Sequence, residues 1–185
     1  MHFRSTFLFW LLVLSALCAA AKESSQSHWD GKSIVSLVNG WQFIPSEFVL
    51  QDFEQYNAVD VESGTPWNKL RNENHTMSGR GHGTYFIELQ IPETIKQFEL
   101  DFGTISSSFA LYVNGKPIKQ VGSPYGDIKH QQANYDTRII KIPIDTTIAL
   151  IVLHVSNNQY NKGGLWQTVY LSSDQKLTMK RRYIV

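Results

Sequence analysis

The chain has a single cysteine and almost no net charge, and both shortages exclude classes of protein. One Cys in 185 residues excludes a disulfide framework and a cysteine-based zinc site. Seventeen Lys and Arg residues stand against 16 Asp and Glu residues, so no field exists that would collect nucleic acid or an anionic membrane. With 42% hydrophobic and 18% charged residues, the chain has the composition of one folded domain rather than a disordered segment.

The start of the chain has the pattern of a secretory signal peptide. Arg4 precedes an apolar run over residues 7–17, and small residues follow before Lys22. We expect cleavage after Ala21, because Ala19 and Ala21 occupy the small positions of the cleavage rule. An uncleaved membrane anchor is the alternative, but the run is shorter than the roughly 20 residues that a membrane span needs.

Removal of residues 1–21 takes away Arg4 and Cys18. The mature chain then has 16 basic against 16 acidic residues, no cysteine and no expected transmembrane span. A lipoprotein would be acylated on Cys18, but Leu17 in front of it is not small. We therefore expect an exported protein, periplasmic in a bacterium or secreted, which depends on its hydrophobic core for stability.

From Ile34 onward the chain has the pattern of short β-strands. Within residues 97–102, apolar residues alternate with Glu99 and Asp101, which are expected to face away from the apolar side. Two strand-like runs flank Asn114-Gly115, the strongest local signal for a hairpin. Strands are expected over residues 84–91, 97–102, 109–113, 116–121, 137–144, 147–155 and 166–171.

Helical periodicity is almost absent. Only residues 47–56 have a spacing that suits a short helix, and alternating βα units are missing. Many short strands joined by Gly, Pro and Asn turns indicate an all-β sandwich or barrel and argue against a parallel α/β fold.

The usual signatures of catalysis are missing too. The sequence has no Gly-x-Ser-x-Gly elbow, and the glycines of residues 79–83 lack the Gly-Lys-Ser/Thr ending of a phosphate loop. The histidines do not pair at metal-binding spacing, and no pair of carboxylates lies on a hydrolase signature. We expect no catalytic residue, no metal and no cofactor.

The segment from Phe98 to Gly122 resembles the core of galactose-binding-like jelly rolls, in particular the sugar-binding domain of glycoside hydrolase family two. In that family an apolar strand runs into Gly, a second ends in Val-Asn-Gly, and a third ends in Val-Gly. The matching residues here are Phe102-Gly103, Val113-Asn114-Gly115 and Val121-Gly122. Further agreement is found at Gly83-Thr84-Tyr85-Phe86, Val155-Ser156-Asn157, Gly163-Gly164-Leu165-Trp166 and Val169-Tyr170-Leu171.

A closer likeness is to the extracytoplasmic sensor domain of bacterial seven-transmembrane receptors with diverse intracellular signalling modules. Those domains share Gly40-Trp41-Gln42-Phe43, Pro66-Trp67, the Asn-Gly hairpin and Lys162-Gly163-Gly164-Leu165-Trp166. The two resemblances imply a jelly-roll β-sandwich of two antiparallel sheets. Its expected bounds are residues 34–172, after a flexible lead-in over residues 22–33 and before a tail over residues 173–185.

The resemblance also guides the choice of ligand residues. In such jelly rolls an aromatic ring holds the C–H face of a sugar, and polar side chains hold its hydroxyls. Trp166 is one candidate plate, although packing in the core or at a sheet edge is the favoured explanation for Trp41, Trp67 and Trp166. The candidate binding residues are Trp67, Arg80, His82, Asp127, His130, Asn157, Asn158, Lys162 and Trp166.

The leading hypothesis is an exported, non-catalytic ligand-binding or sensor module for a carbohydrate or a related small molecule. The catalytic barrel of the hydrolases and the seven spans of the receptors have no counterpart in the sequence. One alternative is a protein-interaction or structural module whose partner is a membrane receptor. The other is a fragment of a glycoside hydrolase or of a seven-transmembrane signalling receptor.

Overall fold

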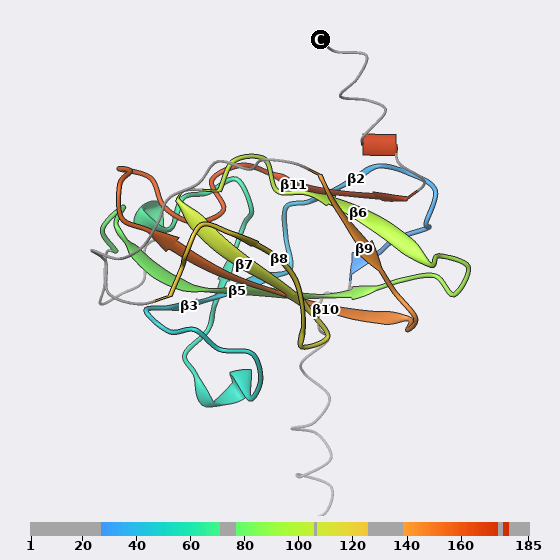
Figure 1. Cartoon of the computed structure of the whole chain (residues 1–185), viewed down its shortest axis with the longest axis horizontal. Helices are drawn as coiled ribbons and strands as arrows, with labels where there is room; N and C mark the ends of the chain where they lie inside the picture. Colours follow the sequence, from blue (N-terminus) through green and yellow to red (C-terminus); the bar gives the residue numbers. More distant parts are fainter. Residues whose placement is uncertain (1–26, 71–76, 106, 126–138, 174–175, 178–185) are drawn as a thin grey trace, which may run out of the picture.

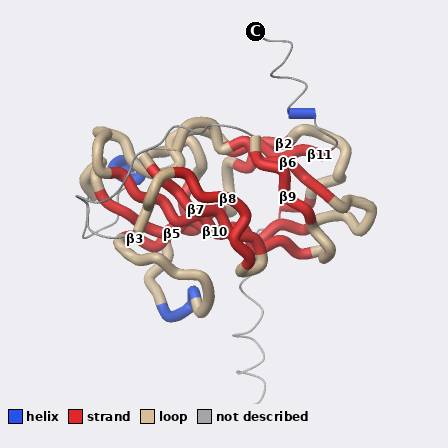
Figure 2. Tube along the Cα trace, in the orientation of Figure 1, coloured by secondary structure: helices blue, strands red, loops and turns tan. Residues whose placement is uncertain are grey.

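The computed structural model describes residues 27–70, 77–105, 107–125, 139–173 and 176–177. Short strands dominate this part of the chain, and two 3-10 helices lie between them (Figure 2). The elements are β1 (Ser27–His28), β2 (Val35–Leu37), β3 (Trp41–Pro45), η1 (Phe53–Gln55), β4 (Val59–Val61), η2 (Trp67–Lys69), β5 (Gly81–Gln90), β6 (Gln97–Asp101), β7 (Ser108–Val113), β8 (Lys116–Val121), β9 (Ile140–Pro143), β10 (Ile148–Asn157) and β11 (Val169–Ser173).

The strands form two sheets that face each other (Figure 1). The larger sheet has seven strands in the order β4-β3-β5-β10-β7-β8, with β1 paired in parallel to the far end of β5. The smaller sheet has four strands in the order β2-β11-β6-β9. Every other pairing is antiparallel, which confirms the expected all-β sandwich of two antiparallel sheets.

The core lies between the sheets and follows from the alternation of side chains along the strands. β10 occupies the centre of the larger sheet, where Ile151, Leu153 and Val155 point inward and are fully buried. The largest fully buried side chains are aromatic and include Trp41, Phe43, Trp67, Tyr85 and Phe98. The aromatic content of the sequence thus fills the space between the sheets.

The local expectations for strands are mostly confirmed, with shifted ends. The hairpin of β7 and β8 turns at Asn114 and Gly115, whose φ angles of 49° and 74° fit the left-handed turn that joins twisted strands. The last strand begins at Val169 rather than residue 166. The helix expected over residues 47–56 is reduced to η1, because Asp52 in front of it is left-handed with φ of 55°.

Glu99 and Asp101 do face away from the core, as the alternation predicts, but they are not solvated. Glu99 is 1% exposed, and its Oε2 accepts a hydrogen bond from the backbone N–H of Leu177. Residues 176–177 therefore cover part of the outer face of the four-stranded sheet. A strand pattern reports only which face a side chain is on, not what covers that face.

The sandwich also begins earlier than the expected boundary at Ile34. Trp29 is 2% exposed within the core, and its indole Nε1 donates to the carbonyl of Ser33. The hydroxyl of Ser173 donates to the carbonyl of Gly31, which ties the last strand to this segment. Residues 27–33 belong to the fold rather than to a flexible lead-in, because the ring of Trp29 is buried in the core. The sequence pattern does not reveal this, because the residues around Trp29 are polar.

Candidate functional site

The loop after β10 carries four of the expected ligand residues, and Asn157 shapes it. Asn157 is 1% exposed; its amide nitrogen lies 2.7–3.0 Å from the carbonyl oxygens of Gly79, Tyr160 and Lys162. Its Oδ1 accepts hydrogen bonds from the backbone N–H groups of Gln159 and Tyr160. Asn157 therefore holds the loop in place and is not open to a ligand.

Trp67 is likewise internal. It is fully buried, it stacks on Phe43 with ring centroids 5.8 Å apart, and its indole N–H points at the carbonyls of Ser78 and Gly79. The contacts of Trp67 fit the packing explanation, and a ligand contact at this residue stays a prediction.

Trp166 is placed differently. It is half-buried and lines a cavity of about 400 Å³ at one end of the sandwich. Lys162, from the same loop, holds its ammonium group 5.8 Å from the centre of the Trp166 ring, within the range of a cation–π contact. The other lining residues come from three segments of the chain: Gly64, Asp101, Gly103, Gln167, Thr168 and Tyr170.

Polar contacts fix the walls of this cavity. The Oδ1 atom of Asp101 accepts from the backbone N–H of Gly103 at 3.0 Å. The Oε1 atom of Gln167 accepts from the backbone N–H of Thr104 at 2.7 Å. The cavity therefore combines two aromatic rings, Trp166 and Tyr170, with oxygen and nitrogen atoms held in fixed positions.

Sequence reasoning missed Asp101, Gln167, Thr168 and Tyr170. One signal was available for Tyr170, because it occupies an outward position of a strand and an aromatic ring there is unusual without a partner or ligand. It is 41% exposed. No local pattern marks the other three, because Asp101 comes close to Gln167 and Thr168 only when β6 and β11 pair.

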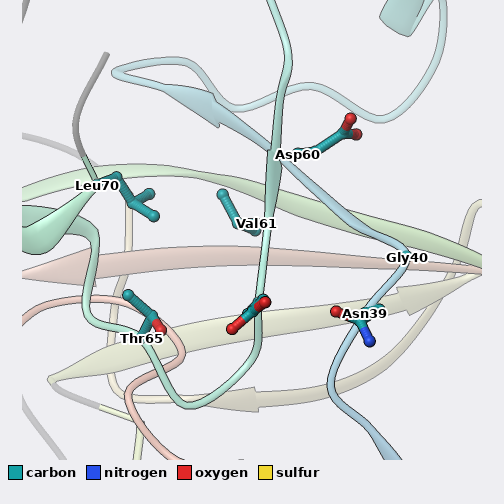
Figure 3. Close-up of a pocket in the computed structure, with 7 residues that line it drawn as sticks. Asn39, Gly40, Asp60, Val61, Thr65 and Leu70 are labelled. Carbon is teal, nitrogen blue, oxygen red and sulfur yellow. The ribbon is translucent and has the colours of Figure 1, made fainter.

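A second cavity, of about 460 Å³, is lined by residues before β3, in β4 and after β4 (Figure 3). Thr65 and Leu70 lie on one side of it and Asn39 and Gly40 on the other, with Val61 between them. Its remaining lining residues are Asp60 and Glu62. This second cavity has no aromatic ring in its lining.

The remaining expected residues are dispersed. Arg80 is exposed next to Ser78. His82 lies in β5 of the larger sheet, with its ring 4.9 Å from that of Phe48. Asn158 accepts a hydrogen bond from the hydroxyl of Ser107.

Asp127 and His130 lie outside the described residues. Of the nine expected residues, the structure thus brings Lys162 beside Trp166, which lines a cavity, and distributes the other described ones elsewhere. In the part of the chain that the structure describes, no three His, Asp, Glu or Cys side chains gather as a metal site would need. No described helix has both the length and the apolar character needed to span a membrane.

Solved structures with the same fold are glycosidases. A putative beta-galactosidase from Bacteroides fragilis matches with a TM-score of 0.56 at 17% identity, over 75% of this chain and 23% of that chain. A GH2 beta-galacturonidase from Eisenbergiella tayi, bound to galacturonate, gives 0.52 at 16% identity, over 80% and 25%. A b-glucuronidase from Ruminococcus gnavus gives 0.51 at 14% identity, over 79% and 30%. Neither a family model nor a curated protein matches the chain.

These likenesses define the class of the fold, a galactose-binding-like β-sandwich. The chain spans 23–30% of the length of these neighbours, in a non-catalytic part of them. The resemblance to the sugar-binding domain of glycoside hydrolase family two agrees with this result at the level of fold. The likeness to the receptor sensor domain stays a prediction.

Proposed function

We propose that this chain is a carbohydrate-binding module that takes a sugar ring in the cavity at Trp166. The observation that carries the proposal is the composition of that cavity, in which Trp166 and Tyr170 stand beside Asp101, Gln167 and Thr168. Aromatic faces pack against the C–H groups of a pyranose, and fixed polar atoms bind its hydroxyls. A cavity of about 400 Å³ has the size of a small-ligand site.

The proposed role is non-catalytic. If the chain is exported, binding of a sugar would serve sensing or recruitment at the cell exterior. Support comes from the apolar run at the start of the sequence and from the non-catalytic part of the glycosidases that shares this fold. Fractionation of the producing cells and N-terminal sequencing of the exported chain test the cleavage after Ala21. A chain that stays in the cytoplasm with its first residues intact would contradict export.

The binding experiment screens the protein against a glycan array and measures the affinity of each hit by calorimetry. Trp166→Ala and Tyr170→Ala should each weaken binding by roughly tenfold or more, because each removes an aromatic face that a sugar would cover. Tyr56→Ala is the matched control. Tyr56 is 39% exposed, nearly the same as Tyr170 at 41%, but it lies in the loop that carries η1, away from the cavity.

Two results would contradict the proposal. One is the absence of any glycan hit for a sample that circular dichroism shows to be folded. The other is a sugar whose affinity is unchanged in Trp166→Ala and Tyr170→Ala, because such a sugar binds elsewhere on the molecule.

A further inference from the structure

A chain of hydrogen bonds runs through His154 on the outer face of the larger sheet. The Nε2 atom of His154 lies 2.9 Å from the carbonyl oxygen of Val49, and its Nδ1 atom lies 2.9 Å from the hydroxyl of Tyr125. That hydroxyl lies 2.5 Å from the hydroxyl of Tyr112. His154 itself is 3% exposed.

Chemistry fixes the direction of every bond in this chain. A carbonyl can only accept, so Nε2 carries the proton and donates to Val49. In a neutral imidazole Nδ1 then has only a lone pair, so Tyr125 donates to it and in turn accepts from Tyr112. The arrangement suits neutral histidine and no other protonation state.

The partner of His154 on this face is the covering segment, residues 46–56. Phe48 of this segment packs against the His154 ring at 5.0 Å and against His82 at 4.9 Å. Phe53 stacks on Phe86 of β5 at 4.2 Å. Figure 1 shows that the loop with η1 lies outside the larger sheet, on the side away from the four-stranded sheet.

The backbone of the covering segment is held at two other points that cannot titrate. The N–H of Val49 donates to the hydroxyl of Thr84, and that hydroxyl donates to the carbonyl of Glu47. The N–H of Ser46 donates to the carbonyl of His82. Only the bond from His154 to Val49 belongs to a group that changes charge near neutral pH.

We propose that His154 makes the covering segment respond to pH, so that an acidic medium loosens it from the outer face of the larger sheet. A protonated ring carries N–H groups on both nitrogens and can no longer accept from Tyr125. The Tyr125 hydroxyl must then turn toward Tyr112, and the Tyr112 proton must find another acceptor. The positive charge also lies at a site that has little access to water.

The surroundings of His154 offer this charge no counter-ion among the described residues that pack on it. The titratable groups that face it are His82 from β5, Tyr112 from β7 and Tyr125 after β8. Glu47 of the covering segment is exposed. Burial lowers the pKa of His154, and the bond to Val49 opposes that shift only in part.

The sign of the pH effect follows from this shift. The unfolded chain binds a proton at His154 near the ordinary pKa of about 6.5, whereas the folded chain binds it only at lower pH. Stability is therefore complete above about pH 6.5 and falls as the pH drops toward the lowered value. The covering segment should loosen before the rest of the fold, because His154 binds it to the outer face of the sheet through the carbonyl of Val49.

Hydrogen exchange of the intact protein at about pH 7.5 and about pH 5, corrected for intrinsic exchange, tests the proposal. Protection of the peptide containing residues 46–56 should fall by roughly tenfold in acid, because protonation of the buried ring removes its acceptor for Tyr125 and places a charge beneath the segment. Peptides from β6 and β11 report global unfolding and should keep their protection. Loss of protection in those peptides to the same degree would overturn the proposal.

Three variants separate His154 from its neighbours. His154→Gln keeps an N–H donor for Val49 but does not titrate, so protection should be equal at both pH values. Thr84→Val removes a non-titrating anchor and should lower protection equally at both. His82→Gln should leave the acid effect intact. An unchanged acid effect in His154→Gln, or its loss in His82→Gln, would contradict the assignment to His154.

Nitrogen-15 spectra of the wild-type imidazoles decide the question even where a variant does not fold. His154 should be the Nε2–H tautomer and should titrate below the other histidines. A Nδ1–H tautomer, or a titration midpoint at or above about 6.5, would overturn the proposal.

Discussion

Gly164 lies where the Trp166 loop passes over the core. It has a φ of 82°, and a Cβ atom there would lie 2.0 Å from the hydroxyl oxygen of Tyr85. Burial raises the pKa of Tyr85, so this hydroxyl remains neutral. The Gly-Gly pair of the sequence is therefore a requirement of packing between this loop and β5 rather than an opening for a ligand.

Substitution of Gly164 by Ala should destabilise the protein strongly. The positive φ alone costs about 1–2 kcal/mol for an L side chain, and the overlap with Tyr85 adds about 1–3 kcal/mol. Gly115→Ala is the matched control, because its φ is 74° but nothing lies within 4 Å of its Cβ position. Denaturant unfolding of both variants measures the difference. Equal stability losses would show that contact with Tyr85 costs nothing.

The residue types in the sequence predicted part of the candidate site, but other residues chosen in the same way lie away from the cavity. Trp166 and Lys162 were identified from a loop motif; the structure places Trp166 in the lining of the cavity and the Lys162 ammonium group over its ring. Trp67 and Asn157 share the same kinds of motif but are internal, because burial depends on which segments fold over them. A sequence records a side chain's chemistry, whereas its exposure is decided by residues far away in the chain.

At the scale of elements, strands and the Asn-Gly hairpin were predictable because their signals are local. Alternation and turn chemistry need only neighbours in the chain. The pairing of β6 with β11 joins residues about seventy positions apart, and no local signal reports it. The wall of the cavity that contains Asp101 and Tyr170 depends on that pairing, so it could not be predicted.

The end of β10 offers a prediction at this scale. Asn157→Asp keeps the Oδ1 acceptor but turns a second oxygen toward the carbonyls of Gly79, Tyr160 and Lys162. A buried carboxylate facing carbonyls should cost about 3 kcal/mol, measured as a loss in free energy of unfolding near neutral pH. The pKa of the new carboxyl should rise above its ordinary value, so the penalty should shrink as the pH falls from neutral toward about 4, because the protonated group donates again.

Asn158→Asp makes the same chemical change one residue later. The Oδ1 atom of Asn158 accepts from the Ser107 hydroxyl, a role that a carboxylate retains. This variant should lose much less stability than Asn157→Asp. If the two variants lose the same stability, Asn157 does not hold the loop through its amide nitrogen.

At the scale of the whole molecule, the first described residues close the sandwich. β1 adds a parallel strand beside Leu89 and Gln90, and Trp29 enters the core at 2% exposure. The same segment meets the last strand through the hydroxyl of Ser173, which donates to Gly31. The two ends of the described chain thus stabilise each other, and residues 27–33 should contribute to global stability although their sequence is largely polar.

A pair of tryptophan substitutions tests this closure in the full chain. Trp29→Ala removes a fully packed ring and the hydrogen bond from its Nε1 to Ser33, so it should cost about 3–5 kcal/mol. Trp166→Ala makes the same chemical change at a half-buried ring that lines a cavity, so it should cost clearly less while it weakens sugar binding. Denaturant midpoints and calorimetry on the two variants give both quantities. Should Trp29→Ala unfold at the wild-type midpoint, residues 27–33 would lie on the sandwich without stabilising it, and the fold would begin at Ile34 as its sequence pattern indicates.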